Sequence, residues 1–269
     1  MPLEHLTGTR FVGRIAVVTG AASGIGRATA LRFGAEGARV AAVDRNAAGA
    51  EETAAQIGAA ARAYGCDVGR SDAVAATAEA VARDLGPVDV LANVAGIGDT
   101  AGLEGIEGLD DARWQAVLAV NLSGPFYWCR AVLPGMAARG HGAIVNVSSL
   151  AGRSKSVNGG LAYTASKAGL LGLTRHLAFD YGPRGVRVNA ICPGGVDTPM
   201  LRAGAASKAK SPEEAAQRAE RARAYGWLMP IKRLSTPDEQ AAAIAFLASD
   251  DASYVNGVSL DVNGGIFMA

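Results

Sequence analysis

A tyrosine and a lysine four residues apart are the pair in this sequence best suited to moving a proton. Tyr163 and Lys167 bound the stretch Y-T-A-S-K, in a run whose apolar residues recur at helical spacing, so both side chains share one face of a helix. A free tyrosine has a pKa of about 10, and a fixed cation beside the phenol lowers that pKa. Because such a pair also occurs as a plain surface contact on amphipathic helices, other motifs must decide its role.

A glycine-rich turn near the start of the chain is suited to holding an anion. An apolar β-branched run at 14–19 leads into G-A-A-S-G-I-G at 20–26, and a helical pattern follows. Gly20, Gly24 and Gly26 permit a tight turn and a close approach of the backbone, and a helix beginning near Gly24 directs free N–H groups at a ligand. The order of strand, turn and helix predicts a pyrophosphate site, whereas a glycine triplet alone is often only a turn.

The residue that ends the next predicted strand bears on the choice of dinucleotide. Asp44 lies where a dinucleotide fold places an acid that accepts hydrogen bonds from the adenosine ribose. A carboxylate about 4 Å from a 2′-phosphate would repel it by several kcal/mol, which favours NAD over NADP. Arg45 keeps the other reading open because its guanidinium could hold that phosphate, and an Asp that merely starts a turn is the structural alternative.

Polar side chains follow several other predicted strands or lie in apolar surroundings. Asp67 and Val68 end the run at 61–68, where Asp67 either meets the adenine or caps the helix starting near Ser71. Asn121 lies in a long helical pattern from Asp110 to about Arg139, and a buried Asn is either a structural hub or part of a site. Ser148 and Ser149 follow the strand at 143–147, and Thr198 lies in the Pro/Gly loop after the strand at 186–192, at the edge where open α/β sheets bind ligands.

The spacing of these elements predicts an α/β fold in one domain that spans residues 1–269. Four β/α repeats in the first hundred residues indicate a parallel sheet with right-handed crossovers and helices on both faces. Three further strands complete a set of seven. The charged, Ala-rich segment at about 200–233 is predicted to be a small helical lid over the pocket, with a plain solvated helix as the alternative.

Composition excludes several classes of function. With 26 basic and 25 acidic residues the net charge is +1 and no block of one sign occurs, so neither nucleic acid nor an anionic membrane is an expected partner. Cys66, Cys129 and Cys192 are widely spaced and predict buried reduced thiols and no metal site. The first residues lack a secretory signal pattern, and we expect a cytoplasmic protein.

Together these motifs resemble the short-chain dehydrogenase/reductase family over residues 10–265. The resemblance rests on T-G-A-A-S-G-I-G at 19–26, N-V-A-G at 93–96, Asn121, the serines after I-V-N-V, Y-T-A-S-K at 163–167 and P-G-G-V-D-T at 193–198. It implies a Rossmann-type, doubly wound sheet of seven parallel strands in the order 3-2-1-4-5-6-7, usually in a homotetramer. It also implies a set of residues that hold NAD: Gly20, Ser23, Gly24, Ile25, Gly26, Asp44, Arg45, Asp67, Val68, Asn93, Ala95, Gly96, Tyr163, Lys167, Pro193, Gly194, Val196 and Thr198.

The family pattern further implies a catalytic tetrad and a reaction. Tyr163 would exchange the proton of an alcohol, Ser149 would orient the substrate oxygen, Lys167 would hold the nicotinamide ribose and polarise Tyr163, and Asn121 would anchor a relay water. The expected activity is NAD-dependent interconversion of a secondary alcohol and a ketone. The alternatives are an NADPH-dependent 3-oxoacyl-thioester reductase and a dinucleotide-binding regulator without turnover.

Two positions depart from that family pattern. Val94 stands where many relatives have a second Asn, and Ser149 precedes Tyr163 by 14 residues, one more than is common. Ser149 remains our choice as the catalytic serine over Ser148, which would be farther from Tyr163 along the chain.

Overall fold

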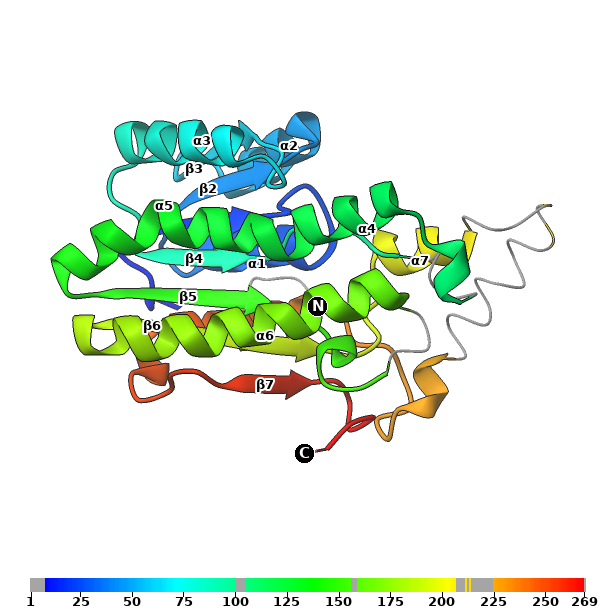
Figure 1. Cartoon of the computed structure of the whole chain (residues 1–269). Helices are drawn as coiled ribbons and strands as arrows, with labels where there is room; N and C mark the ends of the chain where they lie inside the picture. Colours follow the sequence, from blue (N-terminus) through cyan, green and yellow to red (C-terminus); the bar gives the residue numbers. More distant parts are fainter. Residues whose placement is uncertain are drawn as a thin grey trace.

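The fold is one parallel β-sheet between two layers of helices (Figure 1). The computed structural model describes residues 8–99, 105–155, 159–206, 211, 213 and 225–268. Seven strands lie in the order β3-β2-β1-β4-β5-β6-β7, and every neighbouring pair is parallel. The strands are β1 (Ile15–Thr19), β2 (Arg39–Asp44), β3 (Ala61–Gly65), β4 (Val90–Asn93), β5 (Gly142–Val147), β6 (Val186–Pro193) and β7 (Ser259–Val262). The predicted sheet and its strand order are confirmed.

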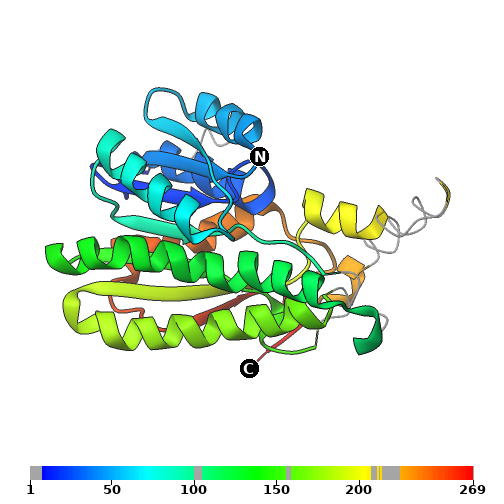
Figure 2. The same cartoon turned by 45° about the horizontal axis from the view of Figure 1, so that its top comes forward.

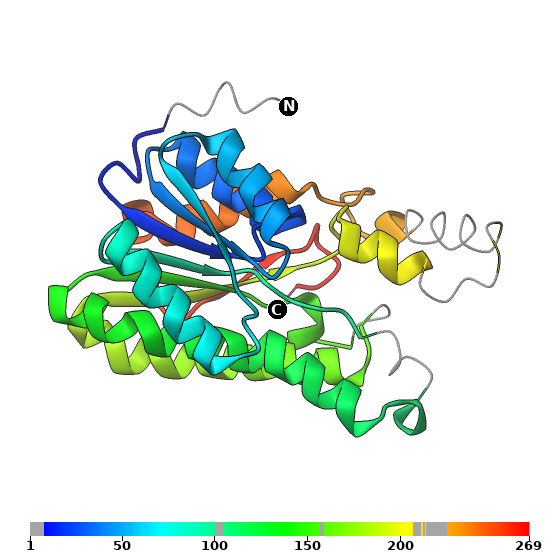
Figure 3. The same cartoon turned by 90° about the horizontal axis from the view of Figure 1, so that it is seen from above.

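The two helical layers cover opposite faces of this sheet, as the view from above shows (Figure 3). One layer consists of α1 (Gly24–Ala35), α2 (Ala47–Ile57) and α9 (Pro237–Ala248), with α1 packed against both others. The opposite layer consists of α3 (Ser71–Asp84), α4 (Asp111–Leu118), α5 (Gly124–Arg139) and α6 (Leu161–Tyr181). Crossover connections to both faces make the fold doubly wound.

Successive side chains of a strand point to opposite faces of the sheet, so the hydrophobic core has two layers, one on each face. In β1, Ile15 and Val17 pack with Trp128 of α5, whereas Ala16 and Val18 pack on the other face with Phe33 of α1. Strands buried on both faces need apolar residues at every position, because successive side chains point to opposite sides. This explains why the strands read as continuous apolar runs.

The predicted continuous helix from Asp110 to Arg139 is interrupted in the structure. A π-helical turn, Ala119–Ser123, separates α4 from α5 and carries Asn121. Pro125 lacks the N–H that an α-helix would donate to the carbonyl of Asn121, so the ladder cannot continue unchanged through this point. The widened turn sets the orientation of a residue that the sequence assigned to the site.

The segment from Asp111 to Arg139 is also long and apolar enough by composition to cross a membrane, with a mean hydropathy of 1.2 over a window of 18 residues. Several of its large side chains are instead part of the core. Trp128, Leu133 and Met136 are almost fully buried against the sheet and α3. The helices of this segment therefore pack against the core of the fold.

The carboxyl ends of the parallel strands lie on the same side of the sheet. In Figures 1 and 2, helix α7 (Pro199–Ala206) projects beyond the carboxyl ends of the strands. A 3₁₀ turn, Tyr225–Leu228, lies farther along the chain. Between these two elements, residues 207–210, 212 and 214–224 of the predicted lid lie outside the described residues.

Candidate active site

The glycine turn between β1 and α1 leaves no room for a Cβ at Gly20 or Gly26. A Cβ on Gly20 would lie 2.9 Å from the backbone of Ala95, and one on Gly26 would collide with the carbonyl oxygen of Gly20. Gly20 also has a φ of 71°, in the left-handed region that favours glycine. The turn therefore brings the start of α1 against β1 and the loop after β4.

The first turn of α1 opens into a groove at the carboxyl edge of the sheet. Ser23, its N-cap residue, makes no side-chain cap hydrogen bond, and the turn contains no acidic residue. The N–H groups of a first helical turn have no partners within the helix, and the helix dipole is positive there. An anionic group of a ligand matches this end of the helix.

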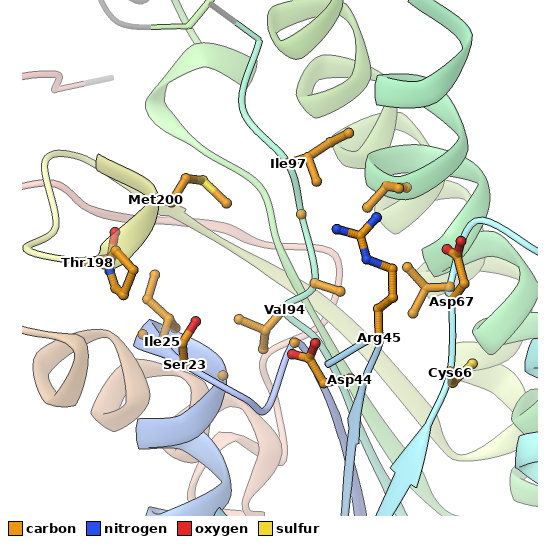
Figure 4. Close-up of a pocket in the computed structure, with 18 residues that line it drawn as sticks. Ser23, Ile25, Asp44, Arg45, Cys66, Asp67, Val94, Ile97, Thr198 and Met200 are labelled. Atoms are coloured by element: carbon orange, nitrogen blue, oxygen red, sulfur yellow. The ribbon is translucent and has the colours of Figure 1, made fainter. Parts of the chain in front are cut away.

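Figure 4 shows this glycine groove and the side chains around it. Twelve residues assigned from sequence to the cofactor line it: Gly20, Ser23, Gly24, Ile25, Gly26, Asp44, Arg45, Asp67, Val68, Ala95, Gly96 and Thr198. Six further lining residues were not assigned to the cofactor: Cys66, Val94, Ile97, Val120, Pro199 and Met200. Ile97 directly follows the N-V-A-G motif, so its place in the loop after β4 was the signal available for it.

Asp44 is fixed at the end of β2 by two backbone amides. Its Oδ2 accepts a hydrogen bond of 2.9 Å from the N–H of Ala22, and its Oδ1 accepts one of 2.8 Å from the N–H of Asn46. The carboxylate thus ties the glycine turn to β2 and faces the groove, where each oxygen retains a lone pair for a ligand hydroxyl. Arg45 extends into the same groove near Asp67 (Figure 4).

Asp67 does not cap the following helix, which rules out the alternative interpretation of this residue. The N-cap of α3 is Arg70, and no side chain caps that helix end. Asp67 Oδ1 instead accepts a hydrogen bond of 2.9 Å from the N–H of Gly69. This turn, which follows the end of β3 at Gly65, directs Asp67 to the groove.

Asn93, a predicted cofactor residue, lies away from the glycine groove, and its cofactor role stays a prediction. It is 2% exposed and is absent from the residues that line the glycine groove. Its Nδ2 donates 2.9 Å to Oδ1 of Asn146, whose own Nδ2 donates 2.9 Å to the hydroxyl of Thr174. Because the β4 side chains alternate between faces, Asn93 points into the helical layer and links β4, β5 and α6.

Three more predicted cofactor residues lie close to the glycine groove but do not line it. Pro193 ends β6, Gly194 packs against Asn263, and Val196 is 7% exposed and bridges to Ser235. Of this loop, only Thr198 was both predicted and found in the lining. Of the others, Val196 supports Thr198 directly, because its carbonyl accepts 3.4 Å from the Thr198 hydroxyl.

The side chains of Lys167 and Asn121 lie next to Gly96, which lines the glycine groove. A Cβ on Gly96 would lie 3.3 Å from Oδ1 of Asn121 and 3.5 Å from Nζ of Lys167. Lys167 is 3% exposed, and its ammonium donates 2.8 Å to the carbonyl of Val147 at the end of β5. A buried cation therefore lies directly behind the backbone that lines the groove.

Asn121 is fully buried, and both the oxygen and the nitrogen of its side-chain amide hydrogen-bond to the loop after β4. Its Oδ1 accepts 2.9 Å from the N–H of Ile97, and its Nδ2 donates 3.0 Å to the carbonyl of the same residue. The Nδ2 also donates 3.2 Å to the hydroxyl of Ser166 on α6. Asn121 thus connects the π-turn, the groove loop and the helix of Tyr163.

The two candidate serines have different environments. Ser148 is buried, and its hydroxyl donates 2.9 Å to the carbonyl of Lys167. Ser149 is partly exposed, accepts 3.1 Å from the N–H of Ala151, and shares a hydrogen bond with the phenol of Tyr163. Ser149 therefore neighbours the proton-transfer group, whereas Ser148 braces the backbone of Lys167.

The electrostatics of Tyr163 differ from the sequence-based prediction. Burial raises the pKa of the phenol above its ordinary value of about 10, and the hydrogen bond with Ser149 only opposes this rise. Burial also lowers the pKa of Lys167 to about 8. The predicted lowering by the lysine is wrong for the free protein, because the desolvation of the buried phenol determines the direction of its pKa shift.

Comparisons with known proteins agree with this geometry. The protein-family model described as Enoyl-(Acyl carrier protein) reductase matches residues 20–267. The D-threitol dehydrogenase of Mycolicibacterium smegmatis is 44% identical, with 95% of this chain and 94% of that protein covered. The cis-4-hydroxycyclohexanecarboxylate dehydrogenase of Sinomonas cyclohexanicum is 42% identical, covering 96% and 98%.

A solved structure extends the likeness to three dimensions. The ligand-free aldohexose dehydrogenase of Thermoplasma acidophilum superposes with a TM-score of 0.82 at 34% identity, over 94% of this chain and 93% of that one. The similarity therefore extends over nearly the whole of both chains.

Proposed function

Because this chain belongs to the short-chain dehydrogenase/reductase family, we propose that it interconverts a secondary alcohol and a ketone with Tyr163 as the general acid/base and NAD as the cofactor. The observation that carries the proposal is the meeting of Lys167, Asn121 and the glycine groove at Gly96. Dehydrogenases of secondary alcohols at about 40% identity support the reaction class.

The residues of the glycine groove fit a nicotinamide dinucleotide. The uncapped start of α1 suits a pyrophosphate, and glycines without room for a Cβ let the backbone reach it. Asp44 suits the adenosine ribose, and Lys167 suits the nicotinamide ribose next to Gly96. When bound, the nicotinamide supplies the acceptor or donor of the hydride.

The residues of this chain then handle the proton. In ketone reduction the neutral phenol of Tyr163 donates its proton to the substrate oxygen as the hydride reaches the carbonyl carbon. In alcohol oxidation the phenolate accepts the hydroxyl proton as the carbon–hydrogen bond breaks. Ser149 donates a hydrogen bond to the oxygen that gains negative charge, and Lys167 stabilises the phenolate. The raised pKa of Tyr163 keeps the phenol protonated near neutral pH, ready for the reductive direction.

NAD is preferred in this proposal because of Asp44, with Arg45 as the opposing feature. The carboxylate of Asp44 is held rigidly by two amides and cannot turn away from a 2′-phosphate. Arg45 lines the same groove and could attract that phosphate, which is the specific observation behind an NADPH-dependent oxoacyl reductase as the second candidate.

A direct assay tests the proposal. The purified protein is mixed with NAD or NADP and a panel of polyols, cyclic alcohols and 3-hydroxyacyl thioesters, and the reduced nicotinamide is followed by its absorbance. Turnover with NAD that is lost in Tyr163→Phe supports the proposal. Binding of NADH without turnover of any substrate would instead support a dinucleotide-binding regulator.

We further propose that the protein forms a homotetramer. Phe126 on α5 and Phe179 on α6 are 42% and 84% exposed, which is unusual for aromatic side chains on adjacent helices of one chain. Light scattering coupled to size-exclusion chromatography measures the mass directly, and a monomer would contradict this assembly.

A further inference from the structure

The helix that carries Tyr163 and Lys167 has no cap from its own sequence. The N-cap residue of α6 is Gly160, which has no side chain to accept a hydrogen bond, and the first turn contains no acidic residue. The first N–H groups of a helix lack partners inside it, so an uncapped start frays. Because Tyr163 lies in this first turn, the position of its phenol depends on what closes the turn.

Asp99, in the loop after β4, supplies the missing cap from 63 positions away. Its Oδ2 accepts 3.2 Å from the N–H of Ala162, the second residue of α6, and its backbone carbonyl accepts 2.9 Å from the N–H of Gly160. An N-cap side chain normally accepts from this same position of a helix. The negative charge also complements the positive end of the helix dipole.

Gly160 is a glycine because Asp99 occupies the space of its side chain. A Cβ there would lie 2.5 Å from Oδ2 and 2.7 Å from the carbonyl oxygen of Asp99. The backbone of Gly160, with φ −73° and ψ −176°, is open to any residue. The glycine therefore serves the close approach of the carboxylate and no special conformation.

Arg113 on α4 balances the charge of this buried carboxylate. The Asp99 side chain is 0% exposed, and Nε of Arg113 lies 3.7 Å from its Oδ1. The same guanidinium donates a hydrogen bond to the carbonyl of Gly98. A buried carboxylate is costly without such partners, so the pair fixes the loop and the cap together.

From this geometry we infer that Asp99, held by Arg113, is a positioning residue that fixes the first turn of α6 and thereby the phenol of Tyr163. The inference rests on the proposed acid/base role of Tyr163. Asn121 hydrogen-bonds to Ile97 in the same loop as Asp99. Asp99 does not line the glycine groove, so its removal should affect the chemical step and spare dinucleotide binding.

The test compares kcat with the dissociation constant of NADH in matched variants. Asp99→Ala should lower kcat by about 10- to 100-fold, because small misplacements of a reacting group have effects of that size. The dissociation constant of NADH, followed by fluorescence, should change less than about twofold. Asp99→Asn keeps an acceptor for the N–H of Ala162 and should recover most of the lost kcat, which a purely structural loss of charge would not predict.

Thr236→Ala is the control, because it removes the N-cap of a helix on the opposite face of the sheet from α6. The Thr236 hydroxyl accepts 3.3 Å from the N–H of Glu239 at the start of α9. This variant should lose comparable stability and keep its kcat. If Asp99→Ala retains the kcat of Thr236→Ala, or loses cofactor affinity as strongly as kcat, the inference is overturned.

Two further variants apply if Asp99→Ala fails to fold. Gly160→Ala pushes against the carboxylate without deleting it, and Arg113→Met removes its counter-charge while keeping the aliphatic bulk. Both should lower kcat and leave NADH binding intact, and unchanged kcat in both would reject the positioning role. Tyr163→Phe in the same series separates the two claims: if it is inactive while Asp99→Ala is fully active, only the role of Asp99 is lost.

Discussion

The ammonium of Lys167 lies 5.7 Å from the centre of the Tyr163 ring. The two residues are one helical turn apart on α6, and the ammonium is held by the carbonyl of Val147. Both groups are buried enough that the pKa of each shifts toward its neutral form. In the free protein near neutral pH, Tyr163 is thus a protonated phenol, and Lys167 is mostly an ammonium that loses its proton more readily than an exposed lysine.

We expect Asp44 to favour NAD and Arg45 to favour NADP, so substituting each residue should shift the preference in opposite directions. Asp44→Ala removes the charge that repels a 2′-phosphate, and we expect the preference for NAD over NADP, measured as the ratio of kcat/KM values, to fall at least about tenfold. Arg45→Met should leave turnover with NAD nearly unchanged and weaken turnover with NADP. A wild type that prefers NADP would contradict the assignment of Asp44.

The tight glycine turn predicts a large effect for a single methyl group. Gly26→Ala places a Cβ against the carbonyl of Gly20, and we expect a loss of about 1–3 kcal/mol in unfolding free energy with at least a tenfold weaker NADH affinity. The matched control is Gly65→Ala on β3, where a Cβ would meet only the Cβ of Ala47 at 3.4 Å. Equal effects of the two substitutions in denaturant unfolding and NADH titration would argue against the packing account.

The buried hydrogen bond of Asn93 predicts a loss of stability without a loss of cofactor binding when this side chain is removed. Asn93→Ala removes the donor to Asn146 inside the core, and an unsatisfied buried acceptor costs about 1–3 kcal/mol. Chemical denaturation should show this decrease, and NADH titration of the folded variant should give the wild-type dissociation constant. A weakened dissociation constant with unchanged stability would return Asn93 to the cofactor site.

The lowered pKa of Lys167 predicts a pH-dependent stability. The folded protein binds fewer protons at this residue than the unfolded chain between about pH 8 and the ordinary pKa near 10.5, so the lysine's contribution to stability rises with pH across that window. Below pH 8 the cost of burying the ammonium is fully present, on the order of 3 kcal/mol. The unfolding free energy of Lys167→Met, minus that of wild type, should therefore decrease from pH 8 to 10.5, and a pH-independent difference would contradict it.

Local sequence patterns predicted most of this fold because the strands are buried on both faces. Continuous apolar runs located the central strands β1, β4 and β5, and the N-terminal glycines located the groove that Asp44 and Asp67 line. The π-turn at Asn121 was not predicted, because its cause is the missing N–H of Pro125 within an otherwise regular helical pattern.

Contacts between segments far apart in the sequence could not be predicted from local sequence patterns. Asp99 reaches α6 through a loop after β4, and no spacing rule connects the two segments. Asn93 ends a strand like the residues of the groove, but its side chain faces the opposite side of the sheet. The direction of the Tyr163 pKa required the burial of the phenol to be known, because the neighbouring lysine alone argues for the opposite shift.

The most direct measurement for the central claim is the single-turnover rate of Tyr163→Phe with a secondary alcohol that the wild type oxidises. Phenylalanine keeps the ring and the packing on α6 and removes only the hydroxyl that exchanges the proton. We predict an NADH dissociation constant within about twofold of wild type and a rate lowered by at least about a hundredfold. A variant that binds NADH normally and turns over at the wild-type rate would contradict Tyr163 as the acid/base.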